Sequence, residues 1–158
     1  MSQLLSELRI LIEDEAEEDF TDEKLKVYLD KYRGTLDDYP LTAETDDNLV
    51  WVCDYKYLDN VILDSATDTV VTDSYTSDDI NGIYIFESAQ HAVYIKANYY
   101  DLYKTESDIW LIRAAKATFS GEARLGDEIL PADKYNREYC IQKYWDLMKS
   151  DYTSMERG

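Results

Sequence analysis

The amino-acid sequence predicts an α+β fold that is mainly helical, with a four-helix core and a small antiparallel β meander inserted between helices two and three. Apolar side chains recur with a helical period near both ends of the chain, whereas the stretch of about 49–97 alternates with the period of two that is typical of strands. The length of 158 residues suits one domain covering residues 1–158.

Two helices are predicted in the N-terminal part. Leucine and isoleucine side chains form a single apolar stripe over about 2–13, which indicates an amphipathic helix. The acidic segment 13–19 has no hydrophobic period and strong self-repulsion, so we interpret it as a solvated linker. Thr21 is a suitable N-cap for a second helix over about 21–33, which Gly34 would end.

The β region follows a polar segment, residues 35–48, which we predict to be a loop. After it, the odd-numbered positions from Leu49 to Tyr57 are strongly apolar, which is typical of a half-buried strand. The predicted strands are Leu49–Leu58, Val61–Leu63, Ile83–Phe86 and Val93–Ala97. We expect 64–81 to be a long hairpin or exposed loop, and the last two strands to pair with each other.

Two further helices are predicted at about 100–119 and 133–149, followed by a flexible tail at 153–158. The first of them is apolar over much of its girth and should be the central helix of the core. We expect Ile109 and Trp110 on it to pack against three side chains of the last helix: Tyr144, Trp145 and Met148.

The charge is strongly acidic and unevenly spread. Net charge is −18, and residues 1–100 carry 7 Lys and Arg against 23 Asp and Glu, whereas residues 101–158 carry 9 against 11. An acidic chain repels phosphates, so ordinary binding of DNA or RNA is not expected. The acidity would instead keep the protein soluble, present a surface that DNA slides past, or attract a basic partner. The 15 tyrosines suit interfaces, although they could equally substitute for phenylalanine in the core.

A search for chemistry predicts no catalytic residue, no cofactor and no metal site. The only histidine, His91, falls in a predicted turn with no catalytic partner assigned to it. Cys53 and Cys140 belong to no CxxC pair and are expected to be buried free thiols in a reducing compartment. Ser77–Ser88 has a weak similarity to a calcium-binding loop but lacks the acidic residues at both ends, so a hairpin loop is favoured. Neither a signal peptide nor a membrane span is predicted.

Several short strings, in their order along the chain, resemble the head-tail connector proteins of tailed bacteriophages, also called head-completion or adaptor proteins. The first is Phe20–Leu25 at the start of the second helix. The second is Val93–Ile95, followed by Tyr99–Tyr103 and a long helix ending at Ala114–Phe119. The third is Gly126–Leu130, which precedes a last helix containing Tyr144. The resemblance covers most of the chain, but the better-known members are largely helical and lack a β region at 49–97.

The resemblance implies a structural virion protein in the neck, assembled in the host cytoplasm. Copies would form a ring, expected to be a dodecamer, beneath the portal protein and offer a platform to a downstream neck or tail protein. DNA would pass through the ring without specific binding. A ring of identical subunits needs a heterologous interface. We place the docking surface mainly in residues 101–158, whose net charge is near neutral, with five candidate interaction residues: Tyr103, Tyr139, Tyr152, Met155 and Arg157.

Two other classes of function are weighed. An acidic DNA mimic would copy a row of phosphates and inhibit a DNA-binding enzyme, and the charge favours this alternative. A hydrolase that uses two carboxylates ranks last, because no motif selects a pair among so many acidic residues.

Overall fold

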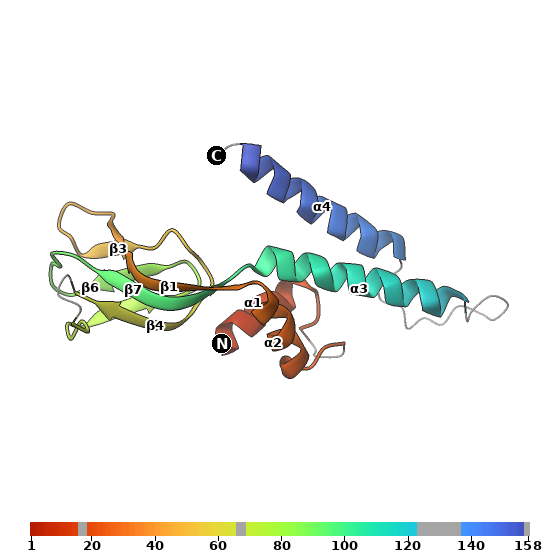
Figure 1. Ribbon diagram of the computed structural model, residues 1–158, viewed down its shortest axis with the longest axis horizontal. Coiled ribbons are helices and arrows are strands. Elements are labelled where there is room, and N and C mark those ends of the chain that lie inside the picture. Colours follow the sequence, from red (N-terminus) through yellow and green to blue (C-terminus); the bar gives the residue numbers. More distant parts are fainter. Residues whose placement is uncertain (16–18, 66–68, 123–136, 157–158) are drawn as a thin grey trace. The chain divides into compact units, whose positions relative to one another are not determined.

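The computed structural model describes residues 1–15, 19–65, 69–122 and 137–156 (Figure 1). These residues form four helices and seven strands. In chain order they are α1 (Ser2–Leu11), α2 (Asp22–Lys31), β1 (Arg33–Pro40), β2 (Thr42–Ala43), β3 (Val50–Val52), β4 (Leu58–Asp64), β5 (Tyr75–Asp78), β6 (Ile83–Phe86), β7 (Tyr94–Tyr100), α3 (Leu102–Glu122) and α4 (Arg137–Glu156). The chain divides into two compact units, which we call the β unit (Met1–Glu7 and Asp19–Asp101) and the helical unit (Leu8–Glu18 and Leu102–Gly158).

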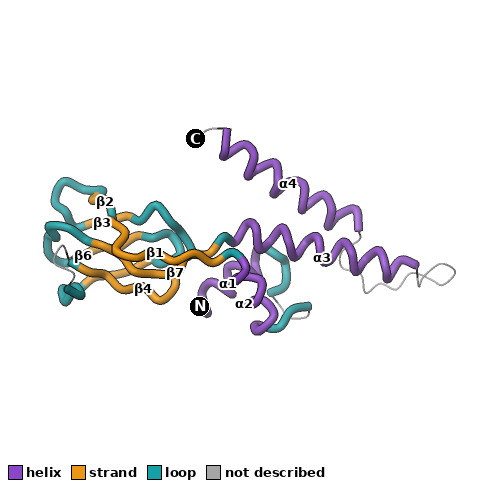
Figure 2. The backbone as a smooth tube through the Cα atoms, in the orientation of Figure 1, coloured by secondary structure: helices purple, strands orange, loops and turns teal. Residues whose placement is uncertain are grey.

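The β unit is built on two antiparallel sheets (Figure 2). Sheet A has the strand order β1-β7-β4, and sheet B has the order β2-β3-β6-β5. Side chains of both sheets meet in one buried cluster, so the two sheets form the two layers of a common core. Its buried members are Leu36, Leu41, Trp51, Cys53, Leu58, Leu63, Tyr84, Phe86, Val93, Ile95 and Ala97.

The prediction of a mainly helical fold with a four-helix core is wrong. The described residues contain seven strands, and the sheets have a buried core of their own rather than decorating a helical one. The β region also begins earlier than predicted, because β1 starts at Arg33 and β2 follows it, where the sequence suggested the end of a helix and a loop over 35–48.

The polar character of β1 explains why it resembles a loop in the sequence. Leu36 is its one buried residue, since β1 is an edge strand of sheet A. Its register against β7 shifts between Leu36 and Tyr39, where Asp38 has a positive φ of 49°. A bulged edge strand with one inward side chain shows no apolar alternation, so periodicity alone cannot detect it.

The predicted pairing of the last two strands is also wrong. β6 pairs with β3 and β5 in sheet B, whereas β7 pairs with β1 and β4 in sheet A. The segment between β6 and β7 therefore crosses from one layer to the other. Leu41, where the chain crosses in the opposite direction between β1 and β2, donates its N–H to the carbonyl of Val93 at 2.9 Å. Two strands that are neighbours in the sequence form a hairpin only when both belong to the same sheet.

The predicted single strand over Leu49–Leu58 is in fact two strands in different sheets. β3 ends at Val52, Tyr57 adopts a positive φ of 56°, and β4 begins at Leu58. The alternation continues through the turn because Cys53 is buried and Tyr55 is partly buried against the same core. Burial thus produced a strand-like pattern where the backbone changes direction.

The hairpin predicted for Ser77–Ser88 is confirmed, and it joins β5 to β6. The Asp78 carboxylate accepts hydrogen bonds from the backbone N–H of Asn81 at 3.1 Å and from its side-chain amide at 2.8 Å, and these bonds lower the Asp78 pKa. Gly82 completes the turn with a φ of +69°. This is a turn in which an Asp side chain caps the backbone.

Gly82→Ala is expected to destabilise the β unit by about 2–3 kcal/mol, because the left-handed φ strains any L-residue and the site has no room. A Cβ at this position would lie 2.7 Å from the Tyr55 carbonyl oxygen and 3.1 Å from the Cys53 Cβ. Urea unfolding followed by circular dichroism measures the loss. Gly34→Ala is the control: its Cβ would meet the Tyr99 ring at 2.1 Å. Shortening that side chain should rescue Gly34→Ala, whereas no side-chain truncation should rescue Gly82→Ala.

In the helical unit, α3 and α4 lie side by side (Figure 1). Trp110, Ala114 and Cys140 are buried between them, with Ile141, Tyr144 and Leu147 packed around. The predicted contact of the Trp110 region with Tyr144 is confirmed. The predicted burial of Trp145 and Met148 is wrong, since 54% and 42% of these side chains are exposed. The residues of α4 packed in this core occupy positions 140, 141, 144 and 147; Trp145 lies to one side of this stripe, whereas Met148 falls within its angular range and is nevertheless exposed.

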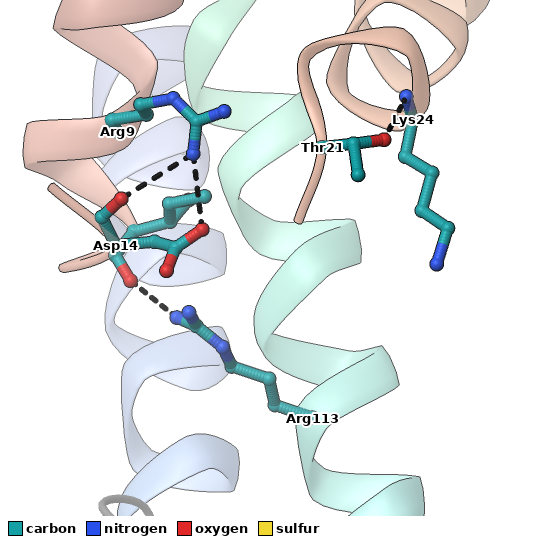
Figure 3. Close-up of polar contacts among 6 residues, drawn as sticks. Arg9, Asp14, Thr21, Lys24 and Arg113 are labelled. Atoms are coloured by element: carbon teal, nitrogen blue, oxygen red, sulfur yellow. Dashed lines mark hydrogen bonds and ion pairs between the residues drawn. The ribbon is translucent and has the colours of Figure 1, made fainter. Parts of the chain in front are cut away.

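The ends of the four helices differ from the predicted ones by a few residues. α1 and α2 end at Leu11 and Lys31, and Gly34 lies inside β1. α4 continues to Glu156, so residues 153–156 of the predicted tail are helical, and residues 157–158 lie outside the described part of the chain. The predicted N-cap is confirmed: the Thr21 side-chain oxygen accepts a hydrogen bond from the Lys24 N–H at 3.4 Å (Figure 3).

Candidate interaction surfaces

The helical unit begins with a tightly bonded turn after α1. Glu13 has a positive φ of 56° and donates its N–H to the Ile10 carbonyl at 3.2 Å, and Asp14 donates to the Arg9 carbonyl at 2.9 Å. This pair of bonds is a Schellman arrangement, here with glutamate in the left-handed position where glycine is usual. It fixes the direction in which the chain leaves the helix.

A buried polar network stabilises this turn (Figure 3). The Arg9 guanidinium donates to the Asp14 carboxylate at 3.1 Å and to the Asp14 carbonyl at 3.4 Å, and Arg113 on α3 donates to the carbonyl of Ile12. Arg9, Asp14 and Arg113 are all buried. The prediction of a solvated linker over 13–19 is therefore wrong for Asp14, which is buried. The sequence did not reveal this, because the leucine stripe of the helix gives no sign that Arg9 is buried beside it.

A second cluster lies where the same turn meets α4. The Glu13 carboxylate accepts hydrogen bonds from the Tyr139 hydroxyl at 3.0 and 3.1 Å and lies 3.6 Å from the Lys143 ammonium. The Tyr139 ring contacts Trp110 edge-on, with ring centroids 5.7 Å apart. Burial and the bond to Glu13 raise the Tyr139 pKa. The cluster orients α4 against α3 and the turn, and we assign it a structural role.

Glu106 is the buried acid of this unit. Its side-chain oxygen accepts a hydrogen bond from the Trp110 indole N–H at 3.2 Å, and burial raises its pKa. The Glu13 carboxylate and the Lys143 ammonium also act on the charge of Glu106, and the bond to the indole holds its carboxyl beside the buried Trp110 ring.

The five predicted interaction residues lie in different surroundings. Tyr103 is exposed near the start of α3. Tyr139 is also exposed, and its hydroxyl donates to the Glu13 carboxylate. Tyr152 and Met155 belong to α4, but their side chains lie outside the described part, as does the whole of Arg157.

Sequence reasoning missed the apolar side chains that the helical unit does expose. Besides Tyr103 and Tyr139, they include Ile10, Leu111 on α3, and Trp145 and Met148 on α4. Trp145 and Met148 are three positions apart and so share one side of α4. The helix carries apolar residues on more than one side, and that excess was a usable signal, because a helix that packs on one face needs only one stripe. We use the name helical patch for four of them on α3 and α4: Tyr103, Leu111, Trp145 and Met148.

A row of tyrosines crosses the β unit. Tyr55 contacts Tyr39 and Tyr99, with ring centroids 5.3 and 4.5 Å apart, and the Tyr39 hydroxyl donates to the Asp54 carboxylate at 2.7 Å. The bond to Asp54 and the negative charge of that residue raise the pKa of Tyr39 to about 12. The sequence left open whether the tyrosines serve interfaces or the core. These three tyrosine rings pack within the unit.

The Tyr39 pKa provides a test of this arrangement. Because the folded pKa of about 12 lies above the ordinary value of 10.0, the neutral phenol is favoured in the fold. Its contribution to stability is complete below pH 10 and is lost as the pH rises through 12. In an ultraviolet difference titration against Tyr39→Phe, the Tyr39 transition should appear near pH 12 and should move toward pH 10 in Asp54→Asn. A transition near pH 10 in both backgrounds would contradict the bond.

The histidine and the two cysteines are the remaining candidates for chemistry. His91 is exposed in the segment between β6 and β7. Cys53 and Cys140 are free and buried as predicted, and burial raises the pKa of both thiols. Within the described ranges, no group of three or more metal-binding side chains gathers, and no helix is both long and apolar enough to cross a membrane.

The chain was compared with models of protein families, with curated proteins and with solved structures. None of the three comparisons found a match.

Proposed function

We propose that this chain is a structural subunit of a phage neck, an adaptor that docks beneath the portal as a ring and connects head to tail. The resemblance of its sequence to head-tail connector proteins supports this proposal. So does the absence of any motif that would assign a reaction to the chain.

The observation that carries the proposal is the helical patch. Tyr103, Leu111, Trp145 and Met148 are exposed on a pair of helices whose own core is already filled by Trp110 and its neighbours. Tryptophan, tyrosine and methionine side chains are enriched in the cores of protein interfaces relative to the rest of the surface. A surface of this kind fits a subunit that is buried on both sides in a ring.

The charge distribution suits a DNA conduit. Residues 1–100 carry 23 acidic against 7 basic residues, so a surface of this part repels phosphates and would let DNA slide without sticking. The near-neutral residues 101–158 include the helical patch, where a close contact with the portal or a neighbouring copy meets less repulsion. A downstream neck or tail protein would complete the assembly.

The test is to mix the chain with the portal ring encoded in the same genome and to weigh the product by mass photometry. We expect one copy per portal subunit. Trp145→Ser with Met148→Ser should weaken assembly at least tenfold while changing the free energy of unfolding by less than about 1 kcal/mol, because both side chains are exposed. Val27→Ser is the control, since Val27 is an exposed apolar residue of α2 in the other unit. If Val27→Ser weakens assembly equally, the helical patch is not part of the interface.

The DNA-mimic alternative is favoured by the acidity of residues 1–100 alone. It predicts tight binding to a basic DNA-binding enzyme that excess duplex DNA competes away. It also predicts that neutralising several acids weakens that binding, whereas changes in the helical patch do not. Assembly on the portal ring that is unaffected by excess duplex DNA would exclude the DNA-mimic function.

A further inference from the structure

The outer face of sheet B carries an apolar square that the core does not use. Trp51, Tyr84 and Phe86 point into the buried cluster, so the alternate residues of β3 and β6 lie on the opposite face. These are Val50 and Val52 on β3 and Ile83 and Ile85 on β6. They are paired directly across the two strands, Val50 with Ile85 and Val52 with Ile83 (Figure 2 shows the strands).

The four side chains are accessible rather than buried under other elements of the unit. Ile85 is 48% exposed, and the other three are partly exposed. None of the four belongs to the buried cluster or to the side chains packed around it. The sequence contained the signal, because Leu49–Cys53 and Ile83–Phe86 are apolar on both faces, whereas a sheet with one solvated face alternates.

The outer face of sheet A, in the same unit, carries charged side chains, of which Asp64 is buried. On its outer face, Lys96 lies 3.2 Å from the Asp38 carboxylate and 3.0 Å from that of Asp64. Ile62 pairs with Lys96 across β4 and β7 and is 47% exposed. A single isoleucine beside an ion pair is normal for a surface, whereas four contiguous β-branched residues form a patch.

Acidic residues stand at two diagonal corners of the square. Asp78 on β5 pairs with Ile83, and Glu44 donates its N–H to the Val50 carbonyl at 2.8 Å, which places it beside Val50 in the register of β2. The other corners are Thr42 beside Val52 and Thr76 beside Ile85. The four strands of sheet B contain no lysine or arginine. From strand spacing and rise, the two carboxylates stand about 15 Å apart.

This arrangement defines the partner by its chemistry. Burying the square against another apolar surface removes it from water, and a cation opposite each acidic corner would complete the match. A second copy of the same face would instead place carboxylates near carboxylates, in a part of the chain that is already strongly acidic. We propose that the outer face of sheet B is a docking surface for a different protein, one that presents an apolar patch flanked by lysine or arginine.

The probe is a cyclic β-hairpin peptide with four valines on one face and a lysine at each end of that face. Its matched control carries glutamate in place of each lysine. With the full-length chain, titration by nuclear magnetic resonance should shift the amide signals of Val50, Val52, Ile83 and Ile85 upon addition of the lysine peptide. Binding should weaken as salt rises, because the corner contacts are exposed charges. The glutamate peptide should bind at least tenfold more weakly.

Matched variants separate docking from general attraction of a basic peptide to an acidic protein. Val50→Thr with Ile85→Thr should weaken binding at least tenfold, whereas Ile62→Thr should change it less than twofold, although Ile62 and Ile85 are equally exposed at 47% and 48%. Glu44→Gln should reduce the salt dependence. Equal effects of Ile62→Thr and Ile85→Thr would overturn the proposal. So would a concentration-dependent dimer that Ile85→Thr abolishes, because the face would then bind a second copy.

This proposal is independent of the adaptor role. If the chain never assembles on a portal but the peptide experiment gives the expected pattern, the docking surface stands and the neck function falls. If assembly occurs and the peptide experiment fails, the reverse holds.

Discussion

Replacing Trp110 with alanine is expected to lower the free energy of unfolding of the helical unit by about 3–5 kcal/mol. Trp110 is fully buried, contacts Tyr139, and receives the guanidinium of Arg113 over its ring at 4.8 Å. Its removal leaves a large cavity between α3 and α4 and takes away the donor to Glu106. Urea unfolding followed by far-ultraviolet circular dichroism measures the loss.

Trp145→Ala is the matched control for that experiment. It removes the same side chain from the same unit, but Trp145 is more than half exposed, so the loss should stay below about 1 kcal/mol. Similar losses in the two variants would show that α4 packs in a different register from the one described. That outcome would also return Trp145 to the core, where the sequence first suggested it.

The second large effect is expected at Asp14. Asp14→Ala should destabilise the helical unit by about 3–5 kcal/mol, because it leaves the buried guanidinium of Arg9 without its carboxylate. The side chains of Arg9 and Asp14 are 7% and 3% exposed, so water cannot replace the lost partner. Thermal or urea unfolding detects a change of this size.

An exposed ion pair provides the control. Arg33 and Asp30 also form an ion pair, at 3.4 Å, but both side chains are about half exposed, and Asp30→Ala should cost less than about 1 kcal/mol. Replacing both partners of the buried pair together, as Arg9→Met with Asp14→Leu, should restore much of the stability that Asp14→Ala loses. A cost at Asp14 no larger than at Asp30 would show that the pair is solvated.

Helices were predictable from the sequence, but most of the β architecture was not. The leucine stripe of α1, the Thr21 cap of α2 and the apolar α3 are local signals that can be recognised within one or two turns. β1 and β5 are polar edge strands with almost no buried side chains, so nothing local distinguishes them from loops. β1 pairs with β7, which lies far along the chain, and such a partner cannot be read from periodicity. β5 pairs with β6 across the short turn at 79–82, so only the hairpin between them had a local signal.

The surfaces were harder to predict than the core. Trp145 and Met148 have the chemistry of core residues, but both are exposed, and the core contacts of α4 come from Cys140, Ile141, Tyr144 and Leu147. Asp14 shows the opposite error, because an acidic run suggests solvent until Arg9 is found buried beside it. In both cases the chemistry of a residue was known and its partner was not.

We propose that the chain is a component of a phage neck. The decisive measurement is a cryo-electron microscopy reconstruction of a neck isolated from virions whose genome carries the gene for this chain. We expect a closed ring of this chain between the portal and the first tail protein, with one copy per portal subunit and the helical patch buried at subunit contacts. A complete neck whose density leaves no place for the chain would contradict the proposal.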